Sequence, residues 1–395
     1  MNKKHLTLSL ASAAVLALLA GATPQANAQT YTVTDLGVLP AKKASSPTAI
    51  NNQGNIVGSS MSDESDSLAF VYNSDKGQIG ALGDVLADSV TRAFGINDAG
   101  VAVGDSSFGG AAFGPSPFVH AALFSNGNSA DLGSLTPGEY SRANGINLAG
   151  TVVGFAGPKK DSSASRAFVW TANSGMIDLG TLGGDYAQAF SINDAGFITG
   201  SASTADDKTG QAASTMHAFL YQYSNNGLAR PMRDLGTLGG ASSYGVFVNA
   251  NSHVVGYSLT SEGRMHAFLH AGGKMADLGS LGGKNFQSDQ SFALGVNAAD
   301  QVVGYTYLPD DNAGAVYPPP QPVAFIYQNG VMTDLNTLIE SAAKTYIIDS
   351  AVAINDRGQI TAHAMDRSSN SVHAVLLTPR LTYPPQGGVR GSAKR

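Results

Sequence analysis

Histidine is the first residue type to consider for a functional site, because it is a common metal ligand and general base. The chain has eight histidines, and four of them precede alanine in a recurring apolar stretch: His120, His217, His266 and His373. No H-x-H or H-E-x-x-H spacing is present to hold one metal ion. We expect these four side chains to form hydrogen bonds at the starts of separate strands.

Aspartate is the second such residue type, since hydrolysis of a glycosidic bond needs a pair of carboxyl groups. Six aspartates recur in a D-L motif: Asp35, Asp131, Asp178, Asp234, Asp277 and Asp334. This recurrence predicts that each accepts a backbone N–H in the turn that follows. Acidic clusters at 63–66, 206–207 and 310–311 could bind calcium, but none has the alternating ligands and distal glutamate of an EF-hand loop. The sequence therefore supports no metal and no other cofactor.

Nucleophiles and phosphate-binding loops are also missing from the sequence. There is no cysteine and no G-x-S-x-G motif. The L-G-G runs are not followed by a helix whose N-terminus could hold a phosphate. With 23 basic and 29 acidic residues, the net charge of −6 offers no basic surface for nucleic acid. These absences predict a protein that is not an enzyme and does not bind nucleic acid.

Three short elements recur in a fixed order along the chain. The first resembles I-N-x-x-G-x-V-V-G, the second H-A-F-L-Y, and the third M-x-D-L-G-T-L-G-G. The first element repeats every 46 to 58 residues, and its asparagines are Asn51, Asn97, Asn147, Asn193, Asn249, Asn297 and Asn355. A repeat of this length is typical of propellers and solenoids.

Each repeat contains the signals of two hairpins. Asparagine and glycine in I-N-x-x-G suit a turn with positive φ between two apolar strands, and H-A-F-L-Y leads through a Gly or Asn turn into the M-x-D-L-G strand. Four antiparallel strands per repeat favour a β-propeller over a β-solenoid, whose coils are shorter. Residues 338–345 are an exception, since they could form one helical turn.

The chain ends predict how the ring closes. The last H-A-F-L-Y element, at 373–377, has no D-L-G strand after it, whereas residues 31–39 form such a strand with no partner before it. Pairing them would complete the seventh blade and remove both free edges. We therefore predict an all-β fold: a seven-bladed β-propeller of four-stranded antiparallel blades, closed by the N-terminal strand completing the last blade.

Small and large residues alternate in the H-A-F-L-Y strand, which predicts how blades pack. An alanine occupies the second place in all seven copies: Ala69, Ala121, Ala167, Ala218, Ala267, Ala324 and Ala374. A phenylalanine follows it in five: Phe70, Phe168, Phe219, Phe268 and Phe325. We expect the alanines to let neighbouring sheets approach and the phenylalanines to fill the opposite face.

The first 28 residues have the pattern of a signal peptide. Lys3 and Lys4 precede an apolar run at 6–20, and Ala26-Asn27-Ala28 is a small-x-small cleavage site. We expect a propeller over 29–381, a disordered tail over 382–395, and no membrane span after the signal is removed. The protein is then secreted or periplasmic, and we expect a monomer.

The three elements together resemble the bacterial extracellular HAF repeat family, named for the His-Ala-Phe that stands here at 217–219 and 266–268. The resemblance covers essentially the whole chain after the signal peptide. It implies an exported repeat protein without an established enzymatic activity. Many members end in an apolar sorting segment, and this chain lacks one, which leaves surface anchoring open.

The links from the V-V-G strand to H-A-F-L-Y differ in length between repeats, and in a propeller they share one face. Variable loops on a fixed ring favour a binding surface. The residues predicted to contact a partner are Tyr305, Tyr307, Tyr317, Asp310 and Asp311. We therefore predict a binding or structural module for a protein or glycan partner at the cell envelope. The alternative is a hydrolase or lyase with its site at the axial mouth.

Overall fold

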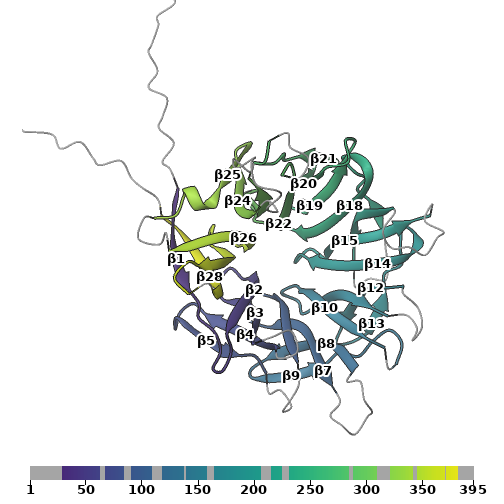
Figure 1. Ribbon diagram of the computed structural model, residues 1–395. Helices are drawn as coiled ribbons and strands as arrows, with labels where there is room; N and C mark the ends of the chain where they lie inside the picture. Colours follow the sequence, from purple (N-terminus) through teal and green to yellow (C-terminus); the bar gives the residue numbers. More distant parts are fainter. Residues whose placement is uncertain are drawn as a thin grey trace, which may run out of the picture.

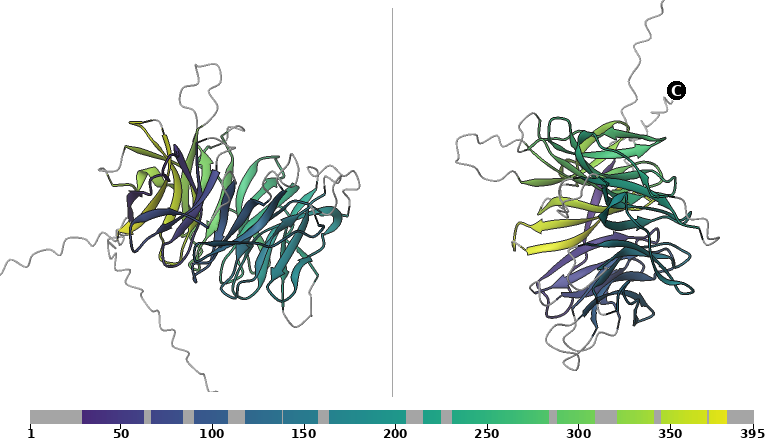
Figure 2. Two further views of the ribbon diagram at one scale, coloured as in Figure 1. Left: turned by 90° about the horizontal axis from the view of Figure 1, so that it is seen from below. Right: turned by 90° about the vertical axis from the view of Figure 1, so that its right-hand side faces the viewer.

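The computed structural model describes residues 29–62, 67–83, 90–108, 118–137, 139–157, 164–205, 215–224, 231–283, 288–308, 321–340, 345–369 and 371–380. These residues form seven four-stranded antiparallel sheets around a central axis (Figure 1). Seen from the side, the ring is a thick disc (Figure 2). The predicted fold class is confirmed. The predicted signal peptide and the tail at 382–395 lie outside the described residues.

Each of the first three blades runs in chain order from the axis outward, and we name the four positions A to D. Blade 1 contains β2 (Ala44–Ile50), β3 (Ile56–Met61), β4 (Ser67–Asn73) and β5 (Gln78–Ala81). Blade 2 contains β6 (Thr91–Ile96), β7 (Ala102–Phe108), β8 (Phe118–Ser125) and β9 (Asn128–Asp131). Blade 3 contains β10 (Ser141–Ile146), β11 (Val152–Ala156), β12 (Arg166–Thr171) and β13 (Gly175–Asp178).

The next three blades repeat this order. Blade 4 contains β14 (Gly183–Ile192), β15 (Phe197–Thr204), β16 (Met216–Gln222) and β17 (Arg233–Asp234). Blade 5 contains β18 (Gly239–Val248), β19 (Val254–Thr260), β20 (Met265–Ala271) and β21 (Lys274–Asp277). Blade 6 contains β22 (Ser291–Val296), β23 (Val302–Tyr307), β24 (Pro322–Gln328) and β25 (Val331–Asp334).

Blade 7 joins the two ends of the chain, as predicted. It contains β26 (Tyr346–Ile354), β27 (Ile360–Asp366) and β28 (Ser371–Arg380), with β1 (Thr30–Asp35) as its outer strand. The β1 strand pairs with β28 over its whole length, and Figure 1 shows the two side by side. His373 Nδ1 lies 2.7 Å from Asp35 Oδ2 across this seam. Closure therefore combines a strand ladder with a side-chain hydrogen bond.

One interlocking contact repeats between blades. Ala121 of blade 2 packs in one cluster with Phe168 of blade 3, and Ala167 of blade 3 packs with Phe219 of blade 4. The same pairing closes the ring, where Ala374 packs with Phe70 of blade 1. All seven alanines and five phenylalanines are at most 1% exposed. The predicted packing is confirmed, because the missing volume of alanine is filled by the phenylalanine of the next blade.

The glycine of V-V-G is required by close backbone approach. At Gly104, an added Cβ would lie 1.8 Å from the carbonyl oxygen of Arg92 on the neighbouring strand, and five further blades repeat this contact at 1.9 to 2.1 Å. Blade 7 has Ala362 at this place. Its A and B strands carry a second register shift between Ile348 and Ser350, and Asp349 is the extra residue. The other blades lack a shift at the equivalent place. A local bulge therefore accompanies the larger side chain.

One short helix occurs in the described part of the chain. It is a 3₁₀ turn, η2 (Leu335–Thr337), which begins at Asp334 and ends before Leu338. The helical turn therefore lies just before the predicted segment 338–345, of which residues 341–344 lie outside the described ranges. None of the helices in the described ranges has the length and hydropathy needed to cross a membrane.

Candidate functional site

The A strands surround the axis and end at the I-N-x-x-G turns, as β14, β22 and β26 show in Figure 1. We call this end of the ring the Asn end. The links between B and C strands and between successive blades leave from the opposite end, which we call the loop end. A side chain's place along the A strand therefore decides which part of the axial passage it lines.

Seven asparagines form a closed ring of hydrogen bonds at the Asn end. Each Nδ2 donates to the backbone carbonyl of the equivalent asparagine in the next blade, at 2.8 to 3.3 Å. The last of these bonds runs from Asn355 back to Asn51. The Oδ1 of Asn97 accepts the backbone N–H groups of Ala99 and Val101 in its own turn. One buried side chain thus satisfies groups in two blades.

Positive φ falls on the glycine place of these turns and not on the asparagine. Gly54, Gly100, Gly150, Gly196 and Gly358 have φ between 73° and 88°. Blades 5 and 6 place Ser252 and Asp300 there, at 63° and 59°. The predicted turns are confirmed. The asparagine was expected to help supply the positive φ, but it contributes through the hydrogen bonds of its side chain.

Two cavities lie behind one another along the axis. The first, of about 330 Å³, is lined by A-strand residues that include Phe94, Phe190 and Phe247. The second, of about 370 Å³, is lined by six of the seven ring asparagines and by Asp98, Asp194 and Asp356. Isoleucines that precede the asparagines border both. The Asn end therefore opens through a polar mouth into an apolar chamber.

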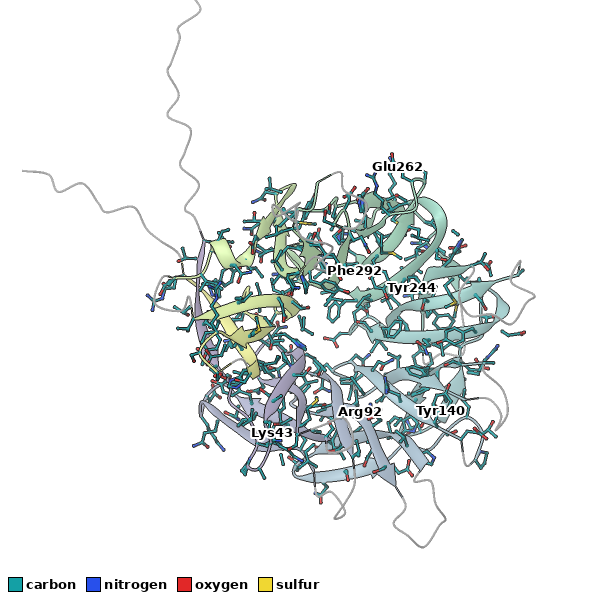
Figure 3. The ribbon with its side chains drawn as sticks, in the orientation of Figure 1. Lys43, Arg92, Tyr140, Tyr244, Glu262 and Phe292 are labelled. Atoms are coloured by element: carbon teal, nitrogen blue, oxygen red, sulfur yellow. The ribbon has the colours of Figure 1, made fainter. Side chains whose placement is uncertain are left out.

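At the loop end, aromatic side chains follow one another across blades 5 and 6. Tyr244 stacks on Tyr257 with ring centroids 5.0 Å apart, and Tyr257 meets the edge of Phe292 at 5.1 Å. Phe292 stacks on Tyr305 at 4.7 Å, and Tyr305 meets Tyr307 at 6.1 Å. Figure 3 shows Tyr244 and Phe292 at the inner edge of the ring. Each ring is thus held in place by its neighbours.

The row of rings continues into blades 3 and 4. Tyr186 lies near Tyr140 and Tyr244, and both neighbours add to the rise that burial causes in its pKa. Tyr140, 40% exposed, meets the edge of Phe155 at 6.2 Å. We define the aromatic belt as these eight residues: Tyr140, Phe155, Tyr186, Tyr244, Tyr257, Phe292, Tyr305 and Tyr307. The belt spans four of the seven blades.

Four of the belt tyrosines have a raised pKa, which favours the protonated form of their hydroxyls. Burial raises the pKa of Tyr186 and of Tyr305 to about 12, and the nearby tyrosines add to the effect. Burial also raises the pKa of Tyr244 and of Tyr257. These four tyrosines are therefore neutral hydrogen-bond donors at physiological pH.

A charged cluster lies at the blade 2 end of the belt. Arg92 binds the carboxylate of Asp105 through Nε and Nη2, at 2.9 and 2.8 Å. Arg142 of the next blade donates from Nε to the same carboxylate at 2.9 Å. The guanidinium of Arg142 also lies 4.7 Å from the ring centre of Phe94 and 5.5 Å from that of Phe155. We call Arg92, Asp105 and Arg142 the arginine cluster.

The recurring histidines lie on separate blades, as predicted, and each binds the recurring aspartate of its own blade. His120, His217 and His266 lie 3.0, 2.8 and 2.9 Å from Asp131, Asp234 and Asp277. The second oxygen of each aspartate accepts a backbone N–H two residues later, for example that of Gly279. The predicted turn role of the aspartates is confirmed, and the pairing ties the C strand to the D strand.

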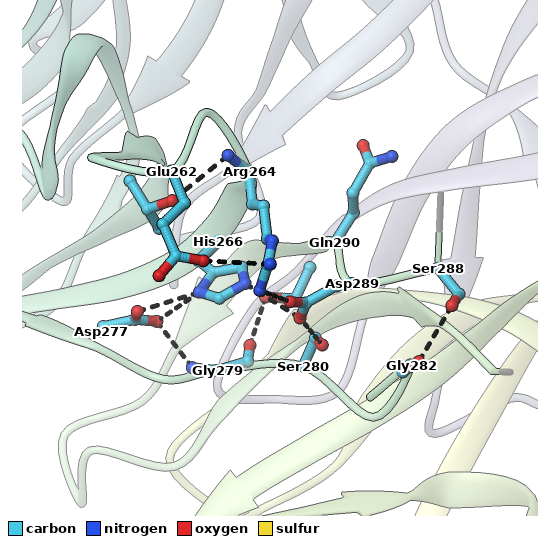
Figure 4. A network of polar contacts seen from close by, with 12 residues as sticks. Glu262, Arg264, His266, Asp277, Gly279, Ser280, Gly282, Ser288, Asp289 and Gln290 are labelled. Atoms are coloured by element: carbon cyan, nitrogen blue, oxygen red, sulfur yellow. Dashed lines mark hydrogen bonds and ion pairs between the residues drawn. The ribbon is translucent and has the colours of Figure 1, made fainter. Parts of the chain in front are cut away.

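The pair in blade 5 extends into a larger network, shown in Figure 4. His266 Nε2 lies 3.1 Å from Asp289, which also binds Arg264 and Ser280. The hydrogen bond to Asp277 raises the pKa of His266, although burial opposes it. Burial disfavours the charge of Asp289, but hydrogen bonds from Ser280 and His266 hold its pKa below the usual value. This network links blade 5 to the segment that precedes β22 of blade 6.

The structure places part of the predicted binding set. Tyr305 and Tyr307 belong to the belt, but they lie on the β23 strand and not in a loop. Asp310, Asp311 and Tyr317 lie outside the described residues, as do the other acidic clusters proposed for calcium. Within the described ranges, no group of three or more His, Asp or Glu side chains is placed to hold a metal ion.

Six belt residues were not predicted from the sequence: Tyr140, Phe155, Tyr186, Tyr244, Tyr257 and Phe292. A signal was present, since Tyr244 and Phe292 each stand five residues before the repeat asparagine, and Arg92 and Arg142 occupy the same place. These positions attract attention only when the seven repeats are aligned and the place is known to lie beside the axis.

Comparisons with known proteins support the fold and no more. A scan of protein-family models found no match, and a search of curated proteins found none either. A chain from a study of two prolyl endopeptidases is 9% identical, with a TM-score of 0.50, over 90% of this chain and 51% of that chain. TolB from Acinetobacter baumannii is 10% identical, with a TM-score of 0.43, over 82% of this chain and 63% of that chain. At such identities the likeness shows the propeller alone.

Proposed function

We propose that the protein is an exported binding module of the HAF type, and that its partner, a glycan or a protein at the cell envelope, docks on the aromatic belt. The aromatic belt is the observation that supports this function. It gathers rings from four blades at the loop end of the axis, and Tyr140 among them is 40% exposed. The signal-peptide pattern supports export.

The chemistry of the belt suits recognition better than bond cleavage. Aromatic rings offer large contact areas, and rings already fixed by their neighbours lose little conformational entropy when a ligand binds. The protonated tyrosine hydroxyls can donate hydrogen bonds to sugar hydroxyls or to backbone carbonyls. The belt itself contains no carboxylate or imidazole that could transfer a proton.

Binding measurements with a belt variant test this function. We would screen the full chain against a glycan array and against purified envelope proteins, and then measure affinity for each hit by calorimetry. The double variant Tyr244→Leu/Phe292→Leu keeps apolar volume but removes two stacked rings, and we expect it to weaken binding at least tenfold.

Val331→Ala is the matched control, because Val331 is 60% exposed and lies on the outer β25 strand, away from the belt. We expect this variant to bind as the unmodified chain does. The function is rejected if neither the glycans nor the envelope proteins bind, or if the belt variant binds every hit with unchanged affinity.

An enzymatic function has one observation in its favour. Ser46 Oγ lies 3.2 Å from His363 Nε2 across the seam between blades 1 and 7. Burial lowers the pKa of His363, although a backbone contact with Pro47 opposes this, so the imidazole is neutral and could activate the serine. Labelling with a fluorophosphonate tests it. Labelling that Ser46→Ala abolishes would support a serine hydrolase, and an unlabelled native chain would reject it.

A further inference from the structure

The arginine cluster carries more positive charge than its own structure requires. The Asp105 side chain is only 1% exposed, and a buried carboxylate needs a cationic partner. Arg92 alone supplies a bidentate partner, which engages both oxygens. Arg142 adds a second positive charge to the same carboxylate. Among the described residues neither arginine pairs with another acid, so the cluster has a net charge of about +1.

The second guanidinium keeps its terminal nitrogens for another ligand. Arg142 uses only Nε for Asp105, and its two Nη atoms have no hydrogen-bond partner among the described residues. Its side chain is 32% exposed. Contacts with the faces of Phe94 and Phe155 and the bond to Asp105 restrain the guanidinium plane. A restrained planar fork is well suited to carboxylate or sulfate oxygens.

The free fork lies beside the aromatic belt. Phe155 contacts the Arg142 guanidinium and also the exposed ring of Tyr140. A ligand on this part of the belt therefore meets an aromatic face and a cation as neighbours. Such a combination suits a ring-shaped ligand that bears a negative group.

We propose that the arginine cluster binds the anionic group of an acidic glycan, a uronate carboxylate or a sulfate ester, while belt rings stack on the neighbouring sugars. This inference rests on the proposed binding function and names its ligand class. Because the arginine cluster has one surplus positive charge, it suits a ligand whose anionic groups are separated by sugar rings. A nucleic acid, with one phosphate at every nucleotide, would instead meet a chain of net charge −6.

Calorimetry with matched trisaccharides tests the proposal on the full chain. The probes are α-1,4-trigalacturonate, a sulfated galactotriose, and neutral α-1,4-galactotriose. We expect the unmodified chain to bind at least one acidic probe about tenfold more tightly than the neutral one, since a bidentate charged contact is lost in the latter. We also expect the affinity for the acidic probe to fall as salt is added, and that for the neutral probe to stay nearly constant.

The variant Arg142→Gln should bring the acidic probe to the affinity of the neutral one and leave neutral binding unchanged. Arg166→Gln is the matched control, because Arg166 pairs with Asp178 on the outer strands of blade 3, and it should retain the preference. Circular dichroism would check that both variants fold. If Arg142→Gln does not fold, the salt dependence of the unmodified chain decides.

Equal affinity for the acidic and neutral probes would overturn the proposal, and so would a preference for the acidic probe that persists in Arg142→Gln. An acidic peptide is titrated as a further probe, and its tighter binding than that of either acidic trisaccharide would be the third such outcome. Failure of this inference can be told apart from failure of the proposed function. Neutral galactotriose binding that requires Tyr244 and Phe292 would keep the binding module and remove only the acidic ligand.

Discussion

The two ends of the axial passage are lined by the same A strands, but only the Asn end has the same residue in every blade. At the Asn end, asparagine occupies the equivalent place in all seven blades. Five residues earlier, at the loop end, the seven places hold serine, arginine, glutamine, tyrosine or phenylalanine. The asparagine ring requires uniformity, because each side chain bonds to the next blade and one substitution opens the circle. The loop end has no such circle, so its chemistry can differ from blade to blade.

The largest loss of stability should follow from a substitution in the asparagine ring. Asn97→Ala removes the bond to Asn147 and leaves the N–H groups of Ala99 and Val101 without their acceptor. We expect the free energy of unfolding to fall by about 3 kcal/mol, roughly 1 kcal/mol for each lost bond. Urea denaturation followed by circular dichroism would measure it. Asn128→Ala, at an exposed asparagine outside the ring, is the control, and an equal loss in both variants would contradict a special role for the ring.

A smaller change in stability should follow at the variable end. Phe292→Leu keeps an apolar side chain but loses the stacking on Tyr305 and the edge contact with Tyr257. We expect a loss of about 1 kcal/mol in the free energy of unfolding, with a clear loss of glycan or protein binding. The two ends differ in role only if Asn97→Ala lowers stability more than Phe292→Leu does, and the same denaturation assay compares them.

The last effect is a gain in stability near the loop end of blade 7, and it should be no larger than the loss in Phe292→Leu. Burial raises the pKa of Asp349 to about 6, although backbone hydrogen bonds oppose this. The folded state therefore holds the proton more tightly than the unfolded state, and stability falls as pH rises from about 4 to about 6. Asp349→Asn removes the charge and should stabilise the protein by about 1 kcal/mol at pH 7, allowing for solvent screening.

Thermal unfolding of Asp349→Asn and of the unmodified chain at pH 4 and pH 7 would test this. The variant should gain at pH 7 and show little difference at pH 4. The exposed Asp75→Asn serves as the control. A gain of the same size at both pH values would show that the charge of Asp349 is not the cause.

The fold was largely predictable because the repeat is local. The I-N-x-x-G turns and the alternation of Ala and Phe each depend on residues close in the sequence, and the orphan strand at the N-terminus predicted closure. The helical turn was placed a few residues late, because Asp334 begins it by accepting the backbone N–H of Asn336. Such a cap is a single side-chain contact that strand patterns do not reveal.

The candidate site was only partly predictable. Tyr305 and Tyr307 were predicted as part of a long variable link between strands, without knowledge of their partners. Phe292 stacks on Tyr305 from β22, and Tyr257 meets Phe292 edge-on from β19. Arg142 and Asp105 are 37 residues apart and meet only because one blade follows the next around the axis. Sequence spacing contains no information on such meetings.

The sequence by itself determined the number of blades, the strand order within each blade and the pairing of the two chain ends, because these follow from short periodic patterns. The tertiary structure decided what the repeated residues do. It turned the turn asparagines into a continuous ring, paired histidine with aspartate across C and D strands, and brought the belt and the arginine cluster together. The reason is geometric: arranging the blades around one axis makes equivalent positions neighbours, and only the closed ring brings the first blade beside the last.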